Sequence, residues 1–229
     1  MKLDNVTIDR SREKRSYYDA CGAAHGLELL GERWAILIIR ELMYGPKRFG
    51  ELRAGLPGIS ANTLTQRLEG LEASRILQRR KLPPPASAQV YELTEWGYEA
   101  EPIIQQLGKW ATRSPDHDPT LPLSSASMIM SLKTMIDRRR SEKMVARLGF
   151  RFGDESFNGR VAYGSFQAWR GEIETVDTAF ITDPTTLAAA VYGGQPLDAL
   201  EASGQLRIEG DRTLAQRFVT LFPLPPKFV

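Results

Sequence analysis

The chain has 229 residues, of which 42% are hydrophobic and 25% are charged, and its formal net charge is +2. This composition is ordinary for a soluble globular protein, and the length suits two domains of about 110 residues each. With one cysteine and two histidines, we expect neither an internal disulfide nor a metal site or other cofactor. The longest apolar run, residues 35–39, is too short to cross a bilayer, and the N-terminus is polar. We therefore expect no secretory signal, no membrane insertion and a cytoplasmic location.

The first elements in chain order are helical. Residues 1–16 are polar and predict a flexible arm. Apolar residues at helical spacing predict a helix over residues 18–30. Residues 32–43 are apolar on nearly every side, which predicts a central buried helix. A short helix over 48–53 follows, and a glycine-rich turn at 55–58 closes it.

The next helix is predicted over residues 61–73, with Ser60 as its N-cap, because a serine hydroxyl accepts a hydrogen bond from a free amide of the first turn. One buried stripe is expected at Leu64, Leu68 and Leu71. Four polar side chains are left facing outward, namely Asn62, Thr65, Gln66 and Glu69.

Two strands, at residues 76–82 and 89–93, flank a proline-rich tip at 83–87, where a residue that cannot donate to a ladder is tolerated. Two small helices joined by a short turn and followed by a basic hairpin predict a winged helix-turn-helix, which lays one helix in the DNA major groove. Residues 40–90 hold nine Lys/Arg against four Asp/Glu, whereas residues 114–229 hold 13 against 14. The positive charge is therefore concentrated where phosphate attraction requires it, although such an excess also fits a merely solvated surface.

Side chains of the 61–73 helix and of the hairpin are the candidate DNA contacts. Amides such as Asn62 and Gln66 bind adenine through two hydrogen bonds, so we expect them, with Thr65, to reach base edges. Cationic side chains are expected on phosphates, but strand alternation sends neighbours to opposite faces, so the three hairpin cations cannot all reach DNA. The candidate set is Arg48, Ser60, Asn62, Thr63, Thr65, Gln66, Arg67, Arg79, Arg80 and Lys81.

A long helix is predicted over residues 95–113, capped by Thr94 and bent at Pro102. The apolar face of this helix is larger than the surface that the small hairpin could bury. We therefore expect the helix to pack against a second subunit. Three prolines in residues 114–125 predict a linker between a domain at 17–113 and one at 126–229.

The second domain mixes both element types, which predicts an α+β fold. Alternating apolar and polar residues indicate strands, and longer periodic runs indicate helices. The expected helices are 126–138, 184–192, 197–202 and 212–222, and the expected strands are 147–152, 157–162, 165–170, 175–181 and 206–208.

The first domain resembles the HxlR family of bacterial winged-helix transcription regulators, relatives of the MarR type. The residues that carry the resemblance are Cys21 and the runs 27–34, 40–42, 45–52, 56–60, 63–71 and 91–97. The resemblance implies a homodimer that binds a roughly palindromic DNA operator and acts in transcription. Cys21 lies where some family members carry a cysteine that senses oxidants or electrophiles, and Arg15 or His25 is expected to lower its pKa. A small buried apolar residue is the alternative interpretation of this lone cysteine.

The second domain resembles the sterol-carrier type of lipid-binding fold, through residues 182–187, 204–211 and 218–222. That resemblance implies an apolar ligand pocket, which would modulate the regulator, although the same side chains would also simply fill a core. The candidate pocket residues are Ile129, Leu132, Phe150, Phe152, Phe166, Trp169, Phe180, Leu187, Val191, Phe218 and Phe222.

The sequence contains no phosphate-binding loop, dinucleotide fingerprint or metal-ligand motif, so we do not expect an enzyme. From the winged-helix pattern and the resemblance to the HxlR family, we predict a DNA-binding transcription regulator. The alternative is a carrier of lipids or hydrophobic metabolites whose winged helix serves mainly for dimerisation.

Overall fold

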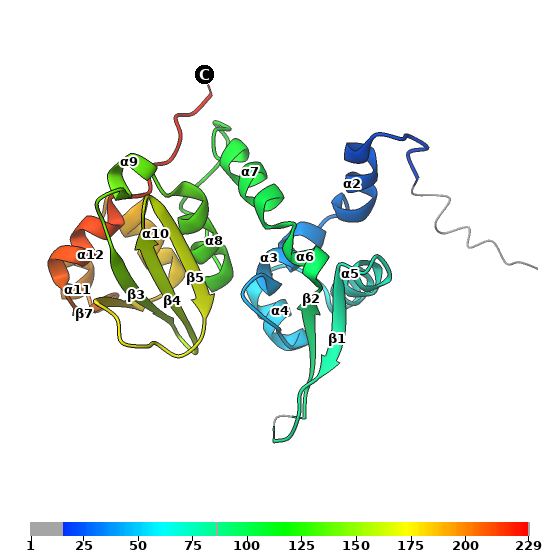
Figure 1. Ribbon diagram of the computed structural model, residues 1–229, viewed down its shortest axis with the longest axis horizontal. Helices are drawn as coiled ribbons and strands as arrows, with labels where there is room; N and C mark the ends of the chain where they lie inside the picture. The colour runs from blue at the N-terminus through cyan, green and yellow to red at the C-terminus, as the bar shows by residue number, and fades with distance from the viewer. Residues whose placement is uncertain (1–15, 86, 229) are drawn as a thin grey trace, which may run out of the picture.

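The computed structural model describes residues 16–85 and 87–228. The predicted arm, apart from Ser16, lies outside the described residues. A helical unit with a two-stranded wing is followed by a unit in which helices pack on a mixed sheet (Figure 1). This arrangement confirms the predicted fold class.

Four helices begin the helical unit: α2 (Gly22–Leu30), α3 (Ala35–Leu42), α4 (Phe49–Gly55) and α5 (Ala61–Ala73). The first helix starts later than predicted, with Cys21 as its N-cap in extended conformation. The second was predicted from residue 32 but begins at Ala35, because Trp34 has a φ of 80°, in the left-handed region that helices exclude.

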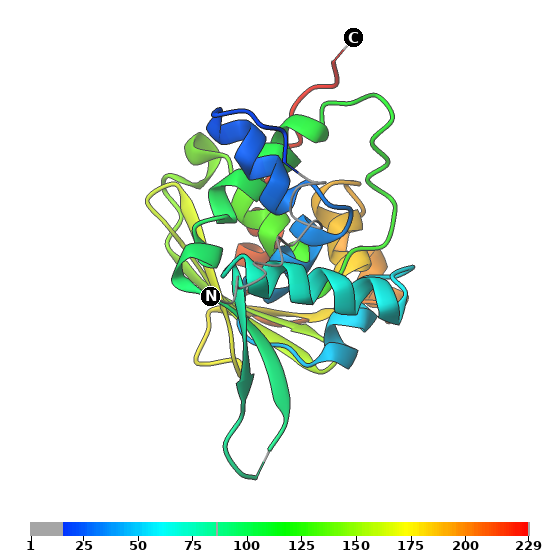
Figure 2. The ribbon, with the colours of Figure 1, turned by 90° about the vertical axis from the view of Figure 1, so that its right-hand side faces the viewer.

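The wing consists of β1 (Leu77–Lys81) and β2 (Gln89–Leu93), paired antiparallel with Leu77 opposite Leu93. Leu77, Tyr91 and Leu93 are buried against the helices, and β1 packs on α5. The hairpin extends well beyond the body of the molecule, and α5 crosses above its base (Figure 2). One edge of the wing also pairs with Lys47 through an isolated bridge to Tyr91.

The predicted long helix is two helices, α6 (Glu95–Tyr98) and α7 (Glu101–Ala111). Pro102 occupies the first turn of α7, where a residue without an amide hydrogen costs nothing. The proline therefore starts a new helix instead of bending an existing one. α7 lies between the two units and contacts both α3 and α8 (Figure 1).

The second unit begins with α8 (Ser125–Met135), so Ser125 is helical, although the sequence places it in the linker. One five-stranded sheet has the order β5-β4-β3-β6-β7, in which only the β3–β6 pair is parallel. The strands are β3 (Ala146–Phe152), β4 (Glu155–Ala162), β5 (Ser165–Arg170), β6 (Thr178–Thr182) and β7 (Arg207–Gly210), and the other helices are α9 (Arg138–Ser141), α10 (Pro184–Val191), α11 (Leu197–Ala202) and α12 (Arg212–Val219). None of the described helices combines the length and the apolar character needed to span a membrane.

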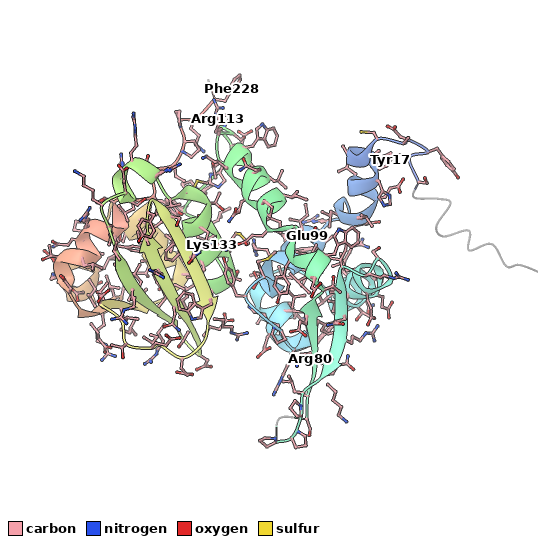
Figure 3. All side chains as sticks on the ribbon, viewed as in Figure 1. Tyr17, Arg80, Glu99, Arg113, Lys133 and Phe228 are labelled. Atoms are coloured by element: carbon pink, nitrogen blue, oxygen red, sulfur yellow. The ribbon has the colours of Figure 1, made fainter. Side chains whose placement is uncertain are left out.

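The two units share a continuous apolar core. The rings of Tyr44, after α3, and Phe157, on β4, meet edge to face with centroids 5.7 Å apart. Lys133 on α8 forms an ion pair with Glu101 on α7 and lies 5.9 Å from the Tyr44 ring (Figure 3). The C-terminal residues return to the end of α7, where the Phe228 amide donates to the Arg113 carbonyl at 2.7 Å (Figure 3). These contacts pack the two units against each other.

Candidate nucleic-acid interface

The exposed face of α5 is the most polar helix surface of the first unit. The Ser60 hydroxyl accepts from the Thr63 amide at 3.1 Å and lies 2.8 Å from the Thr63 hydroxyl, so both residues fix the start of the helix. The predicted stripe of Leu64, Leu68 and Leu71 is fully buried. The opposite face therefore points to solvent by geometry.

Asn62, Thr65 and Gln66 lie on that solvent face and are exposed. Within the described residues no hydrogen bond or ion pair engages their side chains, so their donors and acceptors are available to base edges. Glu69 is exposed on the same helix. A carboxylate at this position repels DNA phosphates. The part of α5 that can approach DNA is therefore its first two turns.

Arg67 is part-buried, and its side chain is held by other residues of the protein. Its guanidinium donates to the Arg33 carbonyl at 3.0 Å and forms an ion pair with Glu32 at 2.6 Å. These contacts join α5 to the turn before α3, next to Trp34. Arg67 is placed to orient the helix, and a phosphate would have to displace its partners.

The hairpin cations lie on opposite faces. Arg79 pairs with Glu72 of α5 at 2.6 Å. Arg80, labelled in Figure 3, pairs with Glu92 across the strands at 2.9 Å. Glu72 also raises the pKa of Arg79 above its ordinary value. Lys81 is exposed near the tip and forms no ion pair with another described residue. Both arginines are part-exposed, and ion pairs at exposed positions are weak. A DNA phosphate could therefore replace Glu72 or Glu92 at small cost in free energy.

Arg48 is the exposed N-cap residue of α4, and its backbone amide donates to Glu51 at 2.6 Å. Its side chain is free of ion pairs within the described residues, as is that of Arg53 on the same helix. The cations around α5 are thus of two kinds, paired ones on the wing and unpaired ones on α4 and at the wing tip.

Cys21 is exposed at the start of α2, so within this single chain it is not packed as a buried apolar residue. The backbone amides of Ala23 and Ala24 at the start of α2 lower the pKa of its thiol below the ordinary value. His25 instead contacts Glu28, at 3.2 Å, and Arg15 lies outside the described residues. The expected cause of the lowered pKa was a cation, whereas the structure supplies helix amides.

Most of the candidate apolar pocket residues of the second unit are buried in its core, and two of them lie at or near the surface. Trp169 is exposed on the outer face of β5, and Val191 is half-buried at the end of α10. All the others are buried in the core cluster. Neighbouring phenylalanine rings have centroid separations of 4.9 Å to 6.2 Å. At these separations aromatic rings are in contact and fill the space between them.

A surface cavity of about 450 Å³ adjoins this core, and Val191 and Phe222 lie on its wall. Segments around α10, α11 and α12 form the rest, from Arg140 to Pro223. Phe222 therefore belongs both to the aromatic core and to the wall of this cavity.

The exposed face of α7 is apolar. Ile103, Leu107 and Trp110 point to solvent, with Trp110 73% exposed, whereas Ile104 is buried toward the second unit. Leu27 on α2 is likewise exposed. An apolar stripe of this kind on two helices of one unit is typical of a surface that another protein chain covers.

Two buried charges at the junction of the units were missed from the sequence. Glu41 on α3 and Lys47 before α4 form an ion pair at 3.1 Å, and both are almost completely buried. The available signal was the adjacent charged pair Arg40 and Glu41 in a helix whose other residues are apolar. In the described part of the chain, His, Cys, Asp and Glu side chains do not gather into a metal-binding group.

Comparison with known proteins finds a matching family for each half of the chain. The model of the HxlR-like helix-turn-helix family matches residues 29–119, and that of the SCP-2 sterol transfer family matches residues 146–223. The HTH-type transcriptional regulator YodB of Bacillus subtilis (strain 168) is 43% identical over 83 residues, 36% of this chain and 74% of that protein. Both resemblances inferred from the sequence are thereby confirmed.

Solved structures similar to the chain include YodB from B. subtilis in two forms. The reduced form has a TM-score of 0.39 and 37% identity, and the match covers 44% of this chain and all of that one (100%). The quinone-bound form has a TM-score of 0.35 and 38% identity, and the match covers 39% of this chain and 93% of that one.

Proposed function

The chain belongs to the HxlR-like helix-turn-helix family, and on that premise we propose that it regulates transcription by binding double-stranded DNA as a homodimer rather than by catalysing a reaction. The observation that carries the proposal is the solvent face of α5, where Asn62, Thr65 and Gln66 are exposed beside a projecting basic hairpin. Base edges are read from this face, and the hairpin cations bind phosphates of the same duplex.

Fluorescence anisotropy with a random-sequence duplex tests the proposal without knowledge of the operator. We expect binding in dilute buffer, with the logarithm of the affinity falling linearly with the logarithm of salt concentration. Lys81→Ala should lower that slope by about one, because one phosphate contact is lost. Lys143→Ala, an exposed lysine of the second unit, is the matched control. Absence of duplex binding at low salt would contradict the proposal and favour the alternative of a lipid carrier.

Gln66 is proposed as a base reader and Arg67 as a residue that positions α5. Once genome-wide footprinting has supplied an operator, Gln66→Ala should reduce the preference for that operator over random DNA, by about 1–3 kcal/mol per lost base contact. Arg67→Gln should weaken both DNA classes alike, since it frees the helix from its anchors at Glu32 and Arg33.

A second copy of the chain is proposed to cover the apolar face of α7 and α2. Pairing there would set the two α5 helices at the separation of successive major grooves, about 34 Å. Leu107→Glu should convert the dimer to a monomer in analytical ultracentrifugation, because a charge would enter a dry interface. Val145→Glu changes an apolar residue of the second unit that is even more exposed than Leu107, and it should leave the dimer intact. Identical sedimentation of both variants would remove this face from the interface.

An apolar effector in the second unit is a further part of the proposal. Similarity to the SCP-2 sterol transfer family supports it, and the cavity beside Val191 and Phe222 is its proposed entrance. The effector would act by binding the DNA-competent dimer and another dimer geometry with different affinities. Native mass spectrometry of the purified protein should reveal a bound lipid, whereas a lipid-free spectrum and no response to added lipids would favour the filled core.

Cys21 supports a second candidate mode of control. Its thiol is exposed and its pKa is lowered, and the relative YodB has been crystallised with a bound quinone. We propose that the thiolate adds to a quinone ring, which forms a carbon–sulfur bond and, after taking up a proton from solvent, leaves a hydroquinone thioether. Intact-mass analysis should show one adduct per chain, absent in Cys21→Ser. Unaltered DNA affinity of the modified protein would exclude a regulatory role.

A further inference from the structure

Arg33, in the turn between α2 and α3, is an exposed cation that lies beside α5. Its backbone carbonyl accepts from the Arg67 guanidinium at 3.0 Å, so the turn is tied to the middle of α5. The Arg33 side chain forms no hydrogen bond or ion pair with another described residue. It was not among the residues expected to contact DNA, which all follow α3 in the chain.

The ring of Trp34 holds the Arg33 side chain in place. The guanidinium carbon lies 5.4 Å from the ring centroid, a distance at which an aromatic ring attracts a cation. The same ring approaches Gly58, in the turn before α5, where an added Cβ atom would lie 3.9 Å from Trp34 Cη2. The guanidinium is therefore held next to the helix-turn-helix and does not extend freely into solvent.

The charge beside this flank of α5 is positive. Arg67 forms an ion pair with Glu32 at 2.6 Å, whereas Arg33 has no carboxylate partner among the described residues. These three charged side chains therefore leave one positive charge uncompensated. An anion can bind Arg33 without displacing an internal carboxylate, in contrast to Arg79 and Arg80 of the wing.

Arg33 and the wing lie on opposite flanks of α5. The centre of the exposed helix face is midway between Asn62 and Gln66. At about 100° per residue, Arg67 lies roughly 120° to one side of that centre, and Glu72 lies roughly 100° to the other. Arg67 contacts the Arg33 carbonyl, and Glu72 contacts the wing. In Figure 2 the wing extends below α5, whereas α2, which precedes the Arg33 turn, lies above it.

A helix that reads base edges has a DNA backbone on each side. The major groove is about 12 Å wide, and a helix with its side chains is about 10–12 Å across. A helix inserted in the groove therefore lies close to the phosphates of both strands. With α5 in that position, the wing lies toward one backbone and the turn that carries Arg33 lies toward the other.

We propose that Arg33 binds a phosphate of the DNA backbone on the side of the major groove opposite the wing. This inference rests on the proposed reading of DNA by α5. The guanidinium donates to phosphate oxygens through charge-assisted hydrogen bonds, and its position over Trp34 reduces the conformational freedom that it loses on binding. Arg33 and the wing then hold α5 from both sides, which fixes the register of its polar face on the bases.

Fluorescence anisotropy of the full-length protein with a random-sequence duplex, repeated at several salt concentrations, tests the proposal. Arg33→Gln should lower the slope of log affinity against log salt by about one and weaken binding roughly tenfold at about 0.1 M salt. Arg139→Gln is the matched control, because it removes the same charge from an exposed arginine of α9, far from the wing (Figure 1). Its slope should equal that of the wild type. Circular dichroism verifies that each variant is folded.

Arg33→Lys separates phosphate binding from a structural role of the stacked guanidinium. Lysine keeps the charge but loses the planar group, so the slope should stay near that of the wild type. Combining Arg33→Gln with Lys81→Ala should lower the slope by about two, because the two side chains contact different phosphates.

The outcomes separate this inference from the proposed function. If the wild type binds DNA but Arg33→Gln and Arg139→Gln have equal slopes, the phosphate contact is overturned and the proposed function stands. Equal losses of slope in Arg33→Gln and Arg33→Lys would also overturn it, since they would assign Arg33 to packing against Trp34. Absence of binding by the wild type at low salt would contradict both.

Discussion

Replacement of Lys47 by methionine tests the buried charges between the units. Methionine keeps the length of the side chain but leaves Glu41, fully buried, without one of its cationic partners. Removing one member of a buried ion pair typically costs 3–5 kcal/mol. Because Arg40 and the Ser124 hydroxyl still contact Glu41, we expect the lower end, about 3 kcal/mol.

Urea denaturation followed by circular dichroism measures this free energy of unfolding. Lys81→Met, an exposed lysine of the wing, is the control and should change it by no more than about 0.5 kcal/mol. Adding Glu41→Gln to Lys47→Met should recover about 1–3 kcal/mol, because no unpaired buried charge then remains. A loss no greater than that of Lys81→Met would refute the view that this pair holds the junction together.

Three further predictions concern stability. Tyr44→Phe should raise the free energy of unfolding by about 1 kcal/mol, because the Tyr44 hydroxyl is buried and has no hydrogen-bond partner among the described residues; a loss of stability in urea denaturation would show a missed partner. Burial raises the pKa of Glu155, but Lys47 and other neighbours lower it by more, so the net value lies below the ordinary one. The stability from a lowered carboxyl pKa is present above the ordinary pKa and is lost as the pH falls through the folded-state pKa. Urea midpoints should therefore fall in acid below about pH 4.3, and Glu155→Gln should flatten this decline; an equally steep decline in that variant would assign it to other carboxyls. Phe218→Ala should cost about 3–5 kcal/mol in the same assay, since its ring contacts several neighbouring rings, and a cost below about 1 kcal/mol would indicate an open pocket.

Elements whose signals are local could be predicted. The residues of α5 were assigned to their bounds, because the Ser60 cap and the leucine stripe at 64, 68 and 71 both act within one helix. The hairpin strands were likewise predicted to within one residue, since proline excludes a ladder at the tip. The start of α3 was missed because the left-handed conformation of Trp34 depends on its packing and has no signature in residue type.

The sequence predicted which residues form the candidate DNA surface, but it did not predict which other side chains they contact. Periodicity places Asn62, Thr65 and Gln66 on the outside, and the structure agrees. Nothing in the spacing shows that Arg67 contacts Glu32 and the carbonyl of Arg33, more than thirty residues earlier. Such a contact depends on how the helices pack.

The amino-acid order by itself determined the two units, the polar solvent face of α5 and the exposed apolar face of α7, because amphipathic periodicity and capping are properties of neighbouring residues. Only the tertiary structure decided that Glu41 and Lys47 are buried together with Glu155, that the phenylalanines of the second unit fill its core, and that a charged cavity lies at the junction. The physical reason is that a charge is tolerated inside a protein only where partners from distant segments meet it. Which segments meet is settled when the apolar faces of the two units close on each other.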